Sequence, residues 1–275
     1  MVIQSRREGA AQAAAPGVHN RLCAGLILTM VLTAGCSSSI YGWQVRTNSS
    51  ALSPSFNQTM LTQEPVSIFA ALGQPGLLGS ETGLEAILAL VLKKVAPQFK
   101  VIAPKETATL INKNGLADEY ARMRIDALQS QILDYKSLQK LGAAIRARYV
   151  FQPKLTTFTQ FMMDRWSFPP IDLKVSRTRS SIMRLSLQLW DMQTGELLWV
   201  SVAEATLQSE AIAQDPVYIE DAARVTMGSM IADFMNGKTA SSYGPLNQII
   251  DQLIQIPQPE SKRNGEDEAI PQDNP

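Results

Sequence analysis

The chain has 275 residues, and 25 lysines and arginines balance 25 aspartates and glutamates, so its formal net charge is zero. A nucleic-acid-binding surface needs basic charge to neutralise phosphates, and we therefore expect no nucleic-acid partner. Hydrophobic residues make up 45% of the chain and charged residues 18%, as in a folded domain rather than a disordered one. Two cysteines cannot form a disulfide framework.

The N-terminal segment has the features of a bacterial lipoprotein signal. Arginines precede an apolar run from Leu22 to Leu32, which is shorter than the ~20 residues that a membrane-spanning helix needs. Small residues then lead to Cys36 in the sequence LTAGC. This motif resembles a lipobox, which implies cleavage after residue 35 and a covalent lipid on the Cys36 thiol. The alternative is an ordinary secretory signal. By analogy with sorting in Gram-negative bacteria, Ser37 indicates the periplasmic face of the outer membrane.

Removal of residues 1–35 excludes several kinds of chemistry. Three arginines, Glu8, His19 and Cys23 leave with this segment, so 22 basic and 24 acidic residues remain and there is no histidine. The mature chain therefore has no Ser-His-Asp triad, Cys-His pair or histidine metal ligand, and it has no phosphate-loop motif. We expect a protein that is not an enzyme and has no cofactor beyond the Cys36 lipid.

Hydrolysis by a pair of carboxylates is the catalytic alternative that stays open, because it needs only two acids. Two pairs of adjacent acids occur in the chain, Asp118 with Glu119 and Glu220 with Asp221. Both pairs stand at predicted helix starts, where acids interact favourably with the helix dipole. We interpret them as structural.

Composition divides the mature chain into three parts. Residues 36–63 are rich in Ser, Asn, Thr and Gln and are predicted to form a flexible tether. Residues 257–275 have little apolar content and are predicted to be disordered. The remaining residues, 64–256, are predicted to form a single periplasmic α/β domain.

The first half of this domain alternates strand and helix patterns. Short apolar runs at 66–72 and 99–103 predict strands. Between them, a capping box of Thr82 and Glu85 precedes apolar residues at helical spacing, and Pro97 ends the predicted helix.

Three more helices are predicted before residue 148. They cover 104–114, with Pro104 at the first position and Gly115 after the end, then 116–129, then a helix capped by Asp134. In the last of these, three apolar residues are expected to face inward: Leu138, Leu141 and Ile145.

The second half is richer in strands. Residues 148–158 predict a strand, in which Pro153 indicates an edge position or a bulge. Residues 184–190 and 196–207 predict a hairpin joined by a turn at 191–195. A helix from 215 to 235 and a last one from 245 to 256 follow. The former carries an apolar stripe with methionines, which we interpret as core: Ala222, Ala223, Met227, Met230, Ile231 and Phe234.

Several of these segments together resemble a known family. They are FKVIAP before a helix that ends in NKNGL, then LGAAIRARYVF leading into a strand, and LWDMQTGELLW as a hairpin. The pattern, from about Pro65 to Asn236, resembles periplasmic lipoproteins of the curli-secretion-channel type. Their relatives include lipoprotein activators of penicillin-binding proteins and exopolysaccharide-export lipoproteins. The resemblance implies an α/β (α+β) domain like the anticodon-binding fold, with helices packed on a mixed sheet and a C-terminal β-hairpin followed by helices.

The hairpin motif of the resemblance is structural. Trp190 and Trp199 are expected to pack across a tight turn formed by Asp191, Thr194 and Gly195.

Residues 156–182 are the one candidate for a membrane-inserting or partner-binding segment. A barrel strand needs about 9–11 residues of alternating polarity, whereas this segment alternates loosely and Pro169–Pro170 interrupts it. We expect a loop at the membrane surface or a binding edge. Its aromatic and basic residues, Arg165, Trp166 and Phe168, have the composition of a protein-interface anchor, and the alternative is a loop that folds them onto the sheet.

The sequence thus predicts a lipid-anchored protein that binds other cell-envelope proteins. The role we favour is an accessory or scaffold subunit of an outer-membrane secretion or surface-polymer export machine. Activation of a cell-wall synthase and formation of an oligomeric export channel are the alternatives. Whether the chain forms a homo-oligomer is left open.

Overall fold

The computed structural model describes residues 40–73, 83–167, 174–209 and 218–244. Cys36, Phe168, the predicted last helix at 245–256 and the predicted disordered tail lie outside these residues. None of the described helices is both long enough and apolar enough to cross a membrane.

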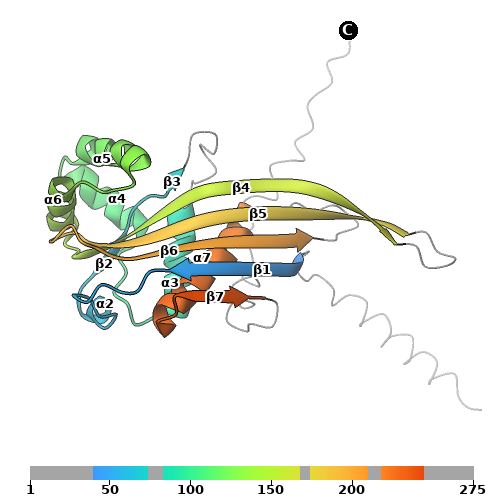
Figure 1. Ribbon diagram of the computed structural model, residues 1–275. Coiled ribbons are helices and arrows are strands. Elements are labelled where there is room, and N and C mark those ends of the chain that lie inside the picture. Colours follow the sequence, from blue (N-terminus) through green and yellow to red (C-terminus); the bar gives the residue numbers. More distant parts are fainter. Residues whose placement is uncertain (1–39, 74–82, 168–173, 210–217, 245–275) are drawn as a thin grey trace, which may run out of the picture. The chain divides into compact units, whose positions relative to one another are not determined.

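A mixed sheet organises the described residues (Figure 1), in the order β2-β4-β5-β6-β1-β7, with the short strand β3 also pairing β4. β2 and β3 are parallel to β4, and the other neighbours are antiparallel. The strands are β1 (Ile40–Ser49), β2 (Val66–Ile68), β3 (Leu72–Gly73), β4 (Tyr149–Ser167), β5 (Lys174–Asp191), β6 (Leu197–Ser209) and β7 (Ala240–Tyr243).

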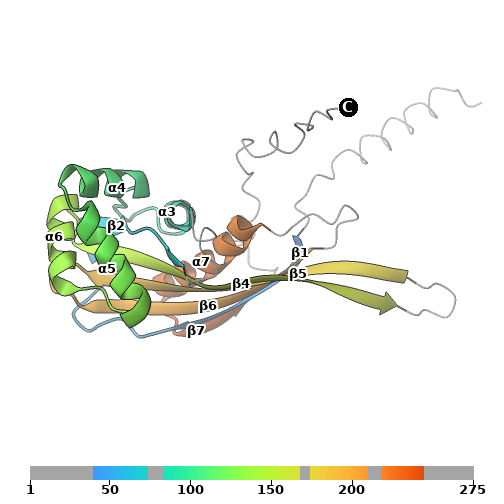
Figure 2. The ribbon, with the colours of Figure 1, turned by 90° about the horizontal axis from the view of Figure 1, so that it is seen from above.

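Helices cover this sheet in two groups (Figure 2). α3 and α7 lie on one face, and α4, α5 and α6 gather at the end where β4 begins. The predicted fold class, helices packed on a mixed α/β sheet, is confirmed. The helices are α2 (Met60–Gln63), α3 (Leu84–Val95), α4 (Pro104–Lys113), α5 (Ala117–Ser130), α6 (Tyr135–Ile145) and α7 (Ile219–Asn236).

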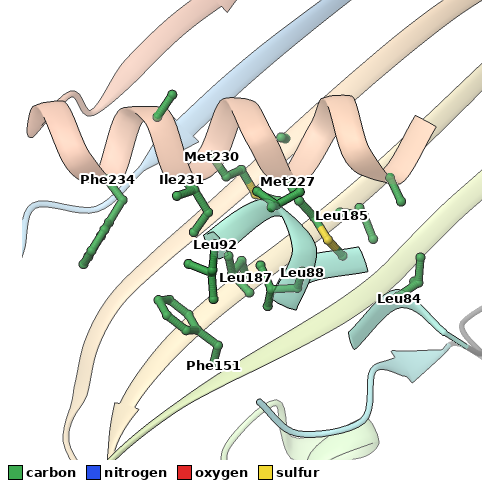
Figure 3. Close-up of a cluster of buried hydrophobic side chains, with 14 of the residues drawn as sticks. Leu84, Leu88, Leu92, Phe151, Leu185, Leu187, Met227, Met230, Ile231 and Phe234 are labelled. Carbon is green, nitrogen blue, oxygen red and sulfur yellow. The ribbon is translucent and has the colours of Figure 1, made fainter. Parts of the chain in front are cut away.

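The larger core lies between the sheet and helices α3 and α7 (Figure 3). All six residues of the predicted apolar stripe on α7 are buried, so the interpretation of that stripe as core is correct. Phe234 contacts the rings of both Phe151 and Trp199 edge-on, with centroids 6.3 and 4.9 Å apart. A second core under α4–α6 includes the inward residues predicted for α6, namely Leu138, Leu141 and Ile145.

The helix ends follow the predicted signals in most places. Asp134 caps α6, since its carboxylate accepts a hydrogen bond from the Ser137 backbone N–H at 2.8 Å. Pro104 occupies the first turn of α4, and Gly115 beyond its end has a φ of +68°. For α3, however, the N-cap is Gly83 at φ +89° rather than the predicted Thr82.

One predicted strand is nearly absent. Residues 99–103 make only an isolated bridge, from Val101 to Val66. Strand pairing does not extend beyond this bridge because Pro104 starts α4 three residues later and its ring nitrogen cannot donate a ladder hydrogen bond.

Pro153 lies inside β4 at a break in the outer pairing. The backbone N–H of Tyr149 donates to Pro65 and the Phe151 carbonyl accepts from Phe69, so these alternate residues face β2. By the same alternation the nitrogen of Pro153 faces outward, where β2 has ended and β3 has not yet begun. A bulge follows between Leu155 and Thr157. The sequence-based expectation of an edge position or a bulge is therefore correct.

The predicted hairpin between β5 and β6 forms, with Asp191 at its centre. One carboxylate oxygen of Asp191 accepts from the backbone of Gln193 at 2.8 Å, and the other accepts from Arg148 Nε at 3.1 Å. Gly195 supplies the left-handed residue at φ +72°. The two tryptophans do not pack across the turn, because Trp190 belongs to the core under α4–α6 and Trp199 to the core under α7.

The predicted tether at residues 36–63 is wrong for every residue that the structure describes, 40–63. Residues 40–49 form β1, paired on one side with β6 and on the other with β7. From Trp43 to Ser49, buried and exposed residues alternate as in a strand that is covered on one face. Ser53 and Ser55 then hydrogen-bond the Glu196 carboxylate and lower its pKa. The polar composition of this segment favoured a tether, although the alternation of its residues with a period of two is typical of a strand.

A buried carboxylate fastens β1 and β7 to α7. Asp233 on α7 is fully buried, and it accepts hydrogen bonds from Tyr243 Oη at 2.5 Å, from Ser241 Oγ at 2.7 Å and from the Thr47 hydroxyl. Burial and this carboxylate raise the pKa of Tyr243, so the phenol stays protonated and remains a donor.

We predict that Asp233→Ala lowers the free energy of unfolding by about 3 kcal/mol, because three hydroxyl donors lose their acceptor inside the core. Chemical denaturation at pH 7 measures the change. Asp126→Ala removes an exposed carboxylate from α5 and should stay within about 0.5 kcal/mol of wild type. Equal effects of the two substitutions would contradict the role given to Asp233.

Asp134→Ala should destabilise the protein by about 1 kcal/mol at neutral pH, because α6 loses its N-cap. The hydrogen bonds from Ser137 lower the pKa of Asp134 in the folded state. Its contribution is therefore complete above the unfolded-state pKa of about 3.9 and is lost as pH falls through the lower folded-state value. Denaturation curves at stepwise lower pH should show wild type and variant converging, and a constant difference would refute this origin.

Candidate functional site

The hairpin of β4 and β5 is the longest element of the fold and extends past the rest of the sheet (Figure 1). Its two strands pair from Tyr149–Asp191 to Ser167–Lys174, with one register shift at the bulge between Leu155 and Thr157. β6 accompanies β5 only as far as Arg179, which pairs with Ser209. Beyond that point, within the described residues, residues 163–167 pair only with residues 174–178. We call this two-stranded part, with Met162 and Arg179 at its base, the ribbon.

One edge of β4 has no strand partner among the described residues over most of its length. β2 pairs with residues 149–151 and β3 with residues 154–155. From Thr156 to Ser167, no described strand lies on the outer side of β4. A strand edge without a neighbour presents backbone N–H and C=O groups that can pair with a strand from another chain.

The side chains beside this open edge are partly apolar. Phe161 and Met162 are 39% and 49% exposed, and because they are adjacent in a strand they lie on opposite faces. Phe158, three residues earlier, packs against the larger core. The edge thus passes from core contacts to exposed apolar groups as it leaves the domain, which is the composition of a contact surface.

The structure corrects the expectation of a loop at residues 156–182. Both sides of this segment are strand, in β4 and β5, and Pro169–Pro170 lie outside the described residues. Two of the three predicted partner-binding residues, Arg165 and Trp166, lie in β4, where they pair with Ser176 and Val175 at the end of the ribbon. Phe168 follows directly and lies outside the described residues.

Sequence reasoning missed the open edge itself. Whether a strand is at an edge depends on which other strands lie beside it. For β4, the described neighbours on that side are β2 at residues 149–151 and β3 at residues 154–155. The spacing of the strands gives no direct signal for this.

The adjacent acids that left hydrolysis open have structural contacts. Asp118 and Glu119 lie in the first turn of α5, and Glu119 also pairs with Lys140 at 2.9 Å. Glu220 and Asp221 lie in the first turn of α7, and Asp221 pairs with Arg224 at 2.8 Å. In the described part of the chain, no group of three or more His, Cys, Asp or Glu residues is placed to hold a metal ion.

No protein-family model and no curated protein matches the sequence. Among solved structures, the PelC dodecamer from Paraburkholderia phytofirmans is similar at 13% identity and a TM-score of 0.39, over 68% of this chain and 95% of that one. The lipoprotein GNA1162 from Neisseria meningitidis is similar at 14% identity and a TM-score of 0.37, over 63% of this chain and 96% of that one.

A PDZ domain protein from Parabacteroides distasonis has 9% identity and a TM-score of 0.33, over 82% of this chain and 42% of that one. All three TM-scores are below 0.5, and a likeness at this level does not carry function from one protein to another.

Proposed function

We propose that the chain is a lipid-anchored, non-enzymatic protein of the bacterial cell envelope. It acts as an accessory or scaffold subunit of an outer-membrane secretion or surface-polymer export machine. The observation that carries the binding role is the part of β4 at Phe161 and Met162, where exposed apolar side chains stand on an edge beside which no described strand lies. The lipobox-like sequence at Cys36 and the resemblance to curli-type lipoproteins support the location and the kind of machine.

Strand addition is the binding mode that this geometry favours. An extended segment of a partner protein adds to the sheet beside β4, so that main-chain hydrogen bonds supply affinity and neighbouring side chains supply specificity. Phe161 and Met162 stand on the two faces of that edge. The partner strand would therefore contact one apolar side chain above the sheet and one below it.

The Cys36 lipid compensates for the low affinity that a single strand edge has for its partner. Acyl chains hold the protein at a bilayer through roughly 0.8 kcal/mol for each buried CH₂. Confinement to a surface then raises the effective concentration of any partner anchored in the same membrane, as a linker does. A single strand edge can therefore serve as the recognition site.

Three observations weigh against the alternative functions. Only three residues separate Cys36 from β1, which gives little reach towards a cell-wall synthase in the opposite membrane. The part of the ribbon that pairs with no third described strand has five residues on each side, whereas a barrel strand needs about 9–11. The acids that a carboxylate hydrolase would use have structural roles.

We predict that Met162→Lys weakens binding of the partner at least tenfold, or about 1.4 kcal/mol, because a lysine on an open edge opposes strand pairing. Val202→Lys is the matched control, since Val202 is 42% exposed but lies on β6, between β5 and β1. Site-specific cross-linking from position 161 in intact cells measures the complex. Equal losses in both variants would refute binding at the edge.

The mass of the native complex, extracted gently from membranes, separates the proposed role from the channel. One or two copies bound to a different envelope protein support an accessory subunit. A ring of many copies cross-linked to one another through position 161 would overturn it in favour of an oligomeric assembly.

A further inference from the structure

The strand that follows the predicted lipid anchor starts at the base of the ribbon. Ile40, the first residue of β1, pairs with Ser209, which in turn pairs with Arg179. Four residues after Cys36 the chain is therefore inside the sheet, two strands away from the ribbon base. A fully extended chain spans at most about 3.6 Å per residue. Covalent geometry alone thus limits the Cys36 Cα to about 14 Å from that of Ile40.

The ribbon is more basic than the rest of the protein. Its two strands, residues 163–167 and 174–178, have three basic residues, Arg165, Lys174 and Arg177, and one acidic residue, Asp164. This segment is net positive, although the mature chain as a whole carries two more acids than bases. Trp166, of a residue type enriched at membrane interfaces, lies in β4 at the ribbon end.

We infer that the ribbon is a second membrane contact, which binds the anionic phospholipid headgroups of the bilayer that holds the Cys36 lipid. A basic, Trp-containing segment placed next to an acyl anchor has the composition that binds an anionic lipid surface. The inference rests on lipidation of Cys36, as the proposed function does. It assigns the ribbon end to lipid and leaves the edge of β4 nearer the domain to protein.

This contact fixes how the domain stands on the membrane. β5 has 18 residues and runs from the ribbon to the hairpin at Asp191, beside α6 (Figure 2). At about 3.3 Å per residue, its two ends lie roughly 60 Å apart. With the ribbon on the lipid surface, helices α4–α6 form the end far from the membrane.

Fluorescence quenching by brominated lipid tests the orientation. The acylated full chain is reconstituted into phosphatidylcholine vesicles that contain phosphatidylglycerol. Of the four tryptophans, Trp43, Trp190 and Trp199 are buried in the domain, so a change on quenching reports Trp166. We expect quenching that Trp166→Phe abolishes. In that background, a reporter at the far end made by Tyr135→Trp should stay unquenched, since Tyr135 is 47% exposed on α6. Quenching at position 135 alone, or at neither position, would overturn the inference.

Charge reversal tests the lipid chemistry. Arg165, Lys174 and Arg177 are changed together to Glu in the full chain carrying Cys36→Ser, so that no acyl chain contributes. The matched control reverses three exposed lysines at the helical end, Lys105, Lys113 and Lys136. Binding to phosphatidylglycerol vesicles should fall at least tenfold in the ribbon variant and much less in the control. Equal losses, or equal binding to pure phosphatidylcholine, would refute headgroup recognition.

The membrane contact and the proposed function can be refuted separately. Cross-linking from position 161 reports the protein partner whether or not the ribbon touches lipid. The mass of the chain isolated from cells shows directly whether Cys36 is acylated. Cross-links without quenching would therefore remove the membrane contact and leave the accessory role in place.

Discussion

The insertion of β1 between β6 and β7 is the constraint on which the functional geometry depends. Asp233 holds this strand in place, because its carboxylate joins Thr47 of β1 with Ser241 and Tyr243 of β7 in one buried network. If β1 were a tether, the lipid anchor and the sheet would be independent. Because β1 is a strand that begins at Ile40, the proposed Cys36 anchor is four residues away from the sheet along the chain.

Much of the fold could be predicted from local patterns. The cap at Asp134, the hairpin turn at Asp191 and the stripe on α7 combine a strong local signal with a packing role that agrees with it. The prediction failed where composition and periodicity disagreed. β1 is polar in composition, yet Trp43, Val45 and Thr47 alternate with exposed residues. The short-range alternation was the better indicator there.

The candidate surface was harder to predict for a different reason. Pro169 and Pro170 favoured a loop, but the described residues on either side of them, up to Ser167 and from Lys174, pair as two strands. Strand pairing at residues 156–167 is non-local, since it depends on β5. No window of sequence around Trp166 contains that information.

The two proposed contacts constrain each other. With the ribbon on the lipid surface, the edge of β4 runs away from the membrane towards the domain, and its exposed apolar residues Phe161 and Met162 lie at the ribbon base. A partner strand added there would begin close to the headgroups and run away from the membrane. Strand addition in this geometry favours partners that are held at the same bilayer, because their own anchors place an extended segment at the same distance from the bilayer surface. Selectivity for envelope partners would then come from position as much as from side-chain recognition, which suits an edge that has few side chains with which to discriminate.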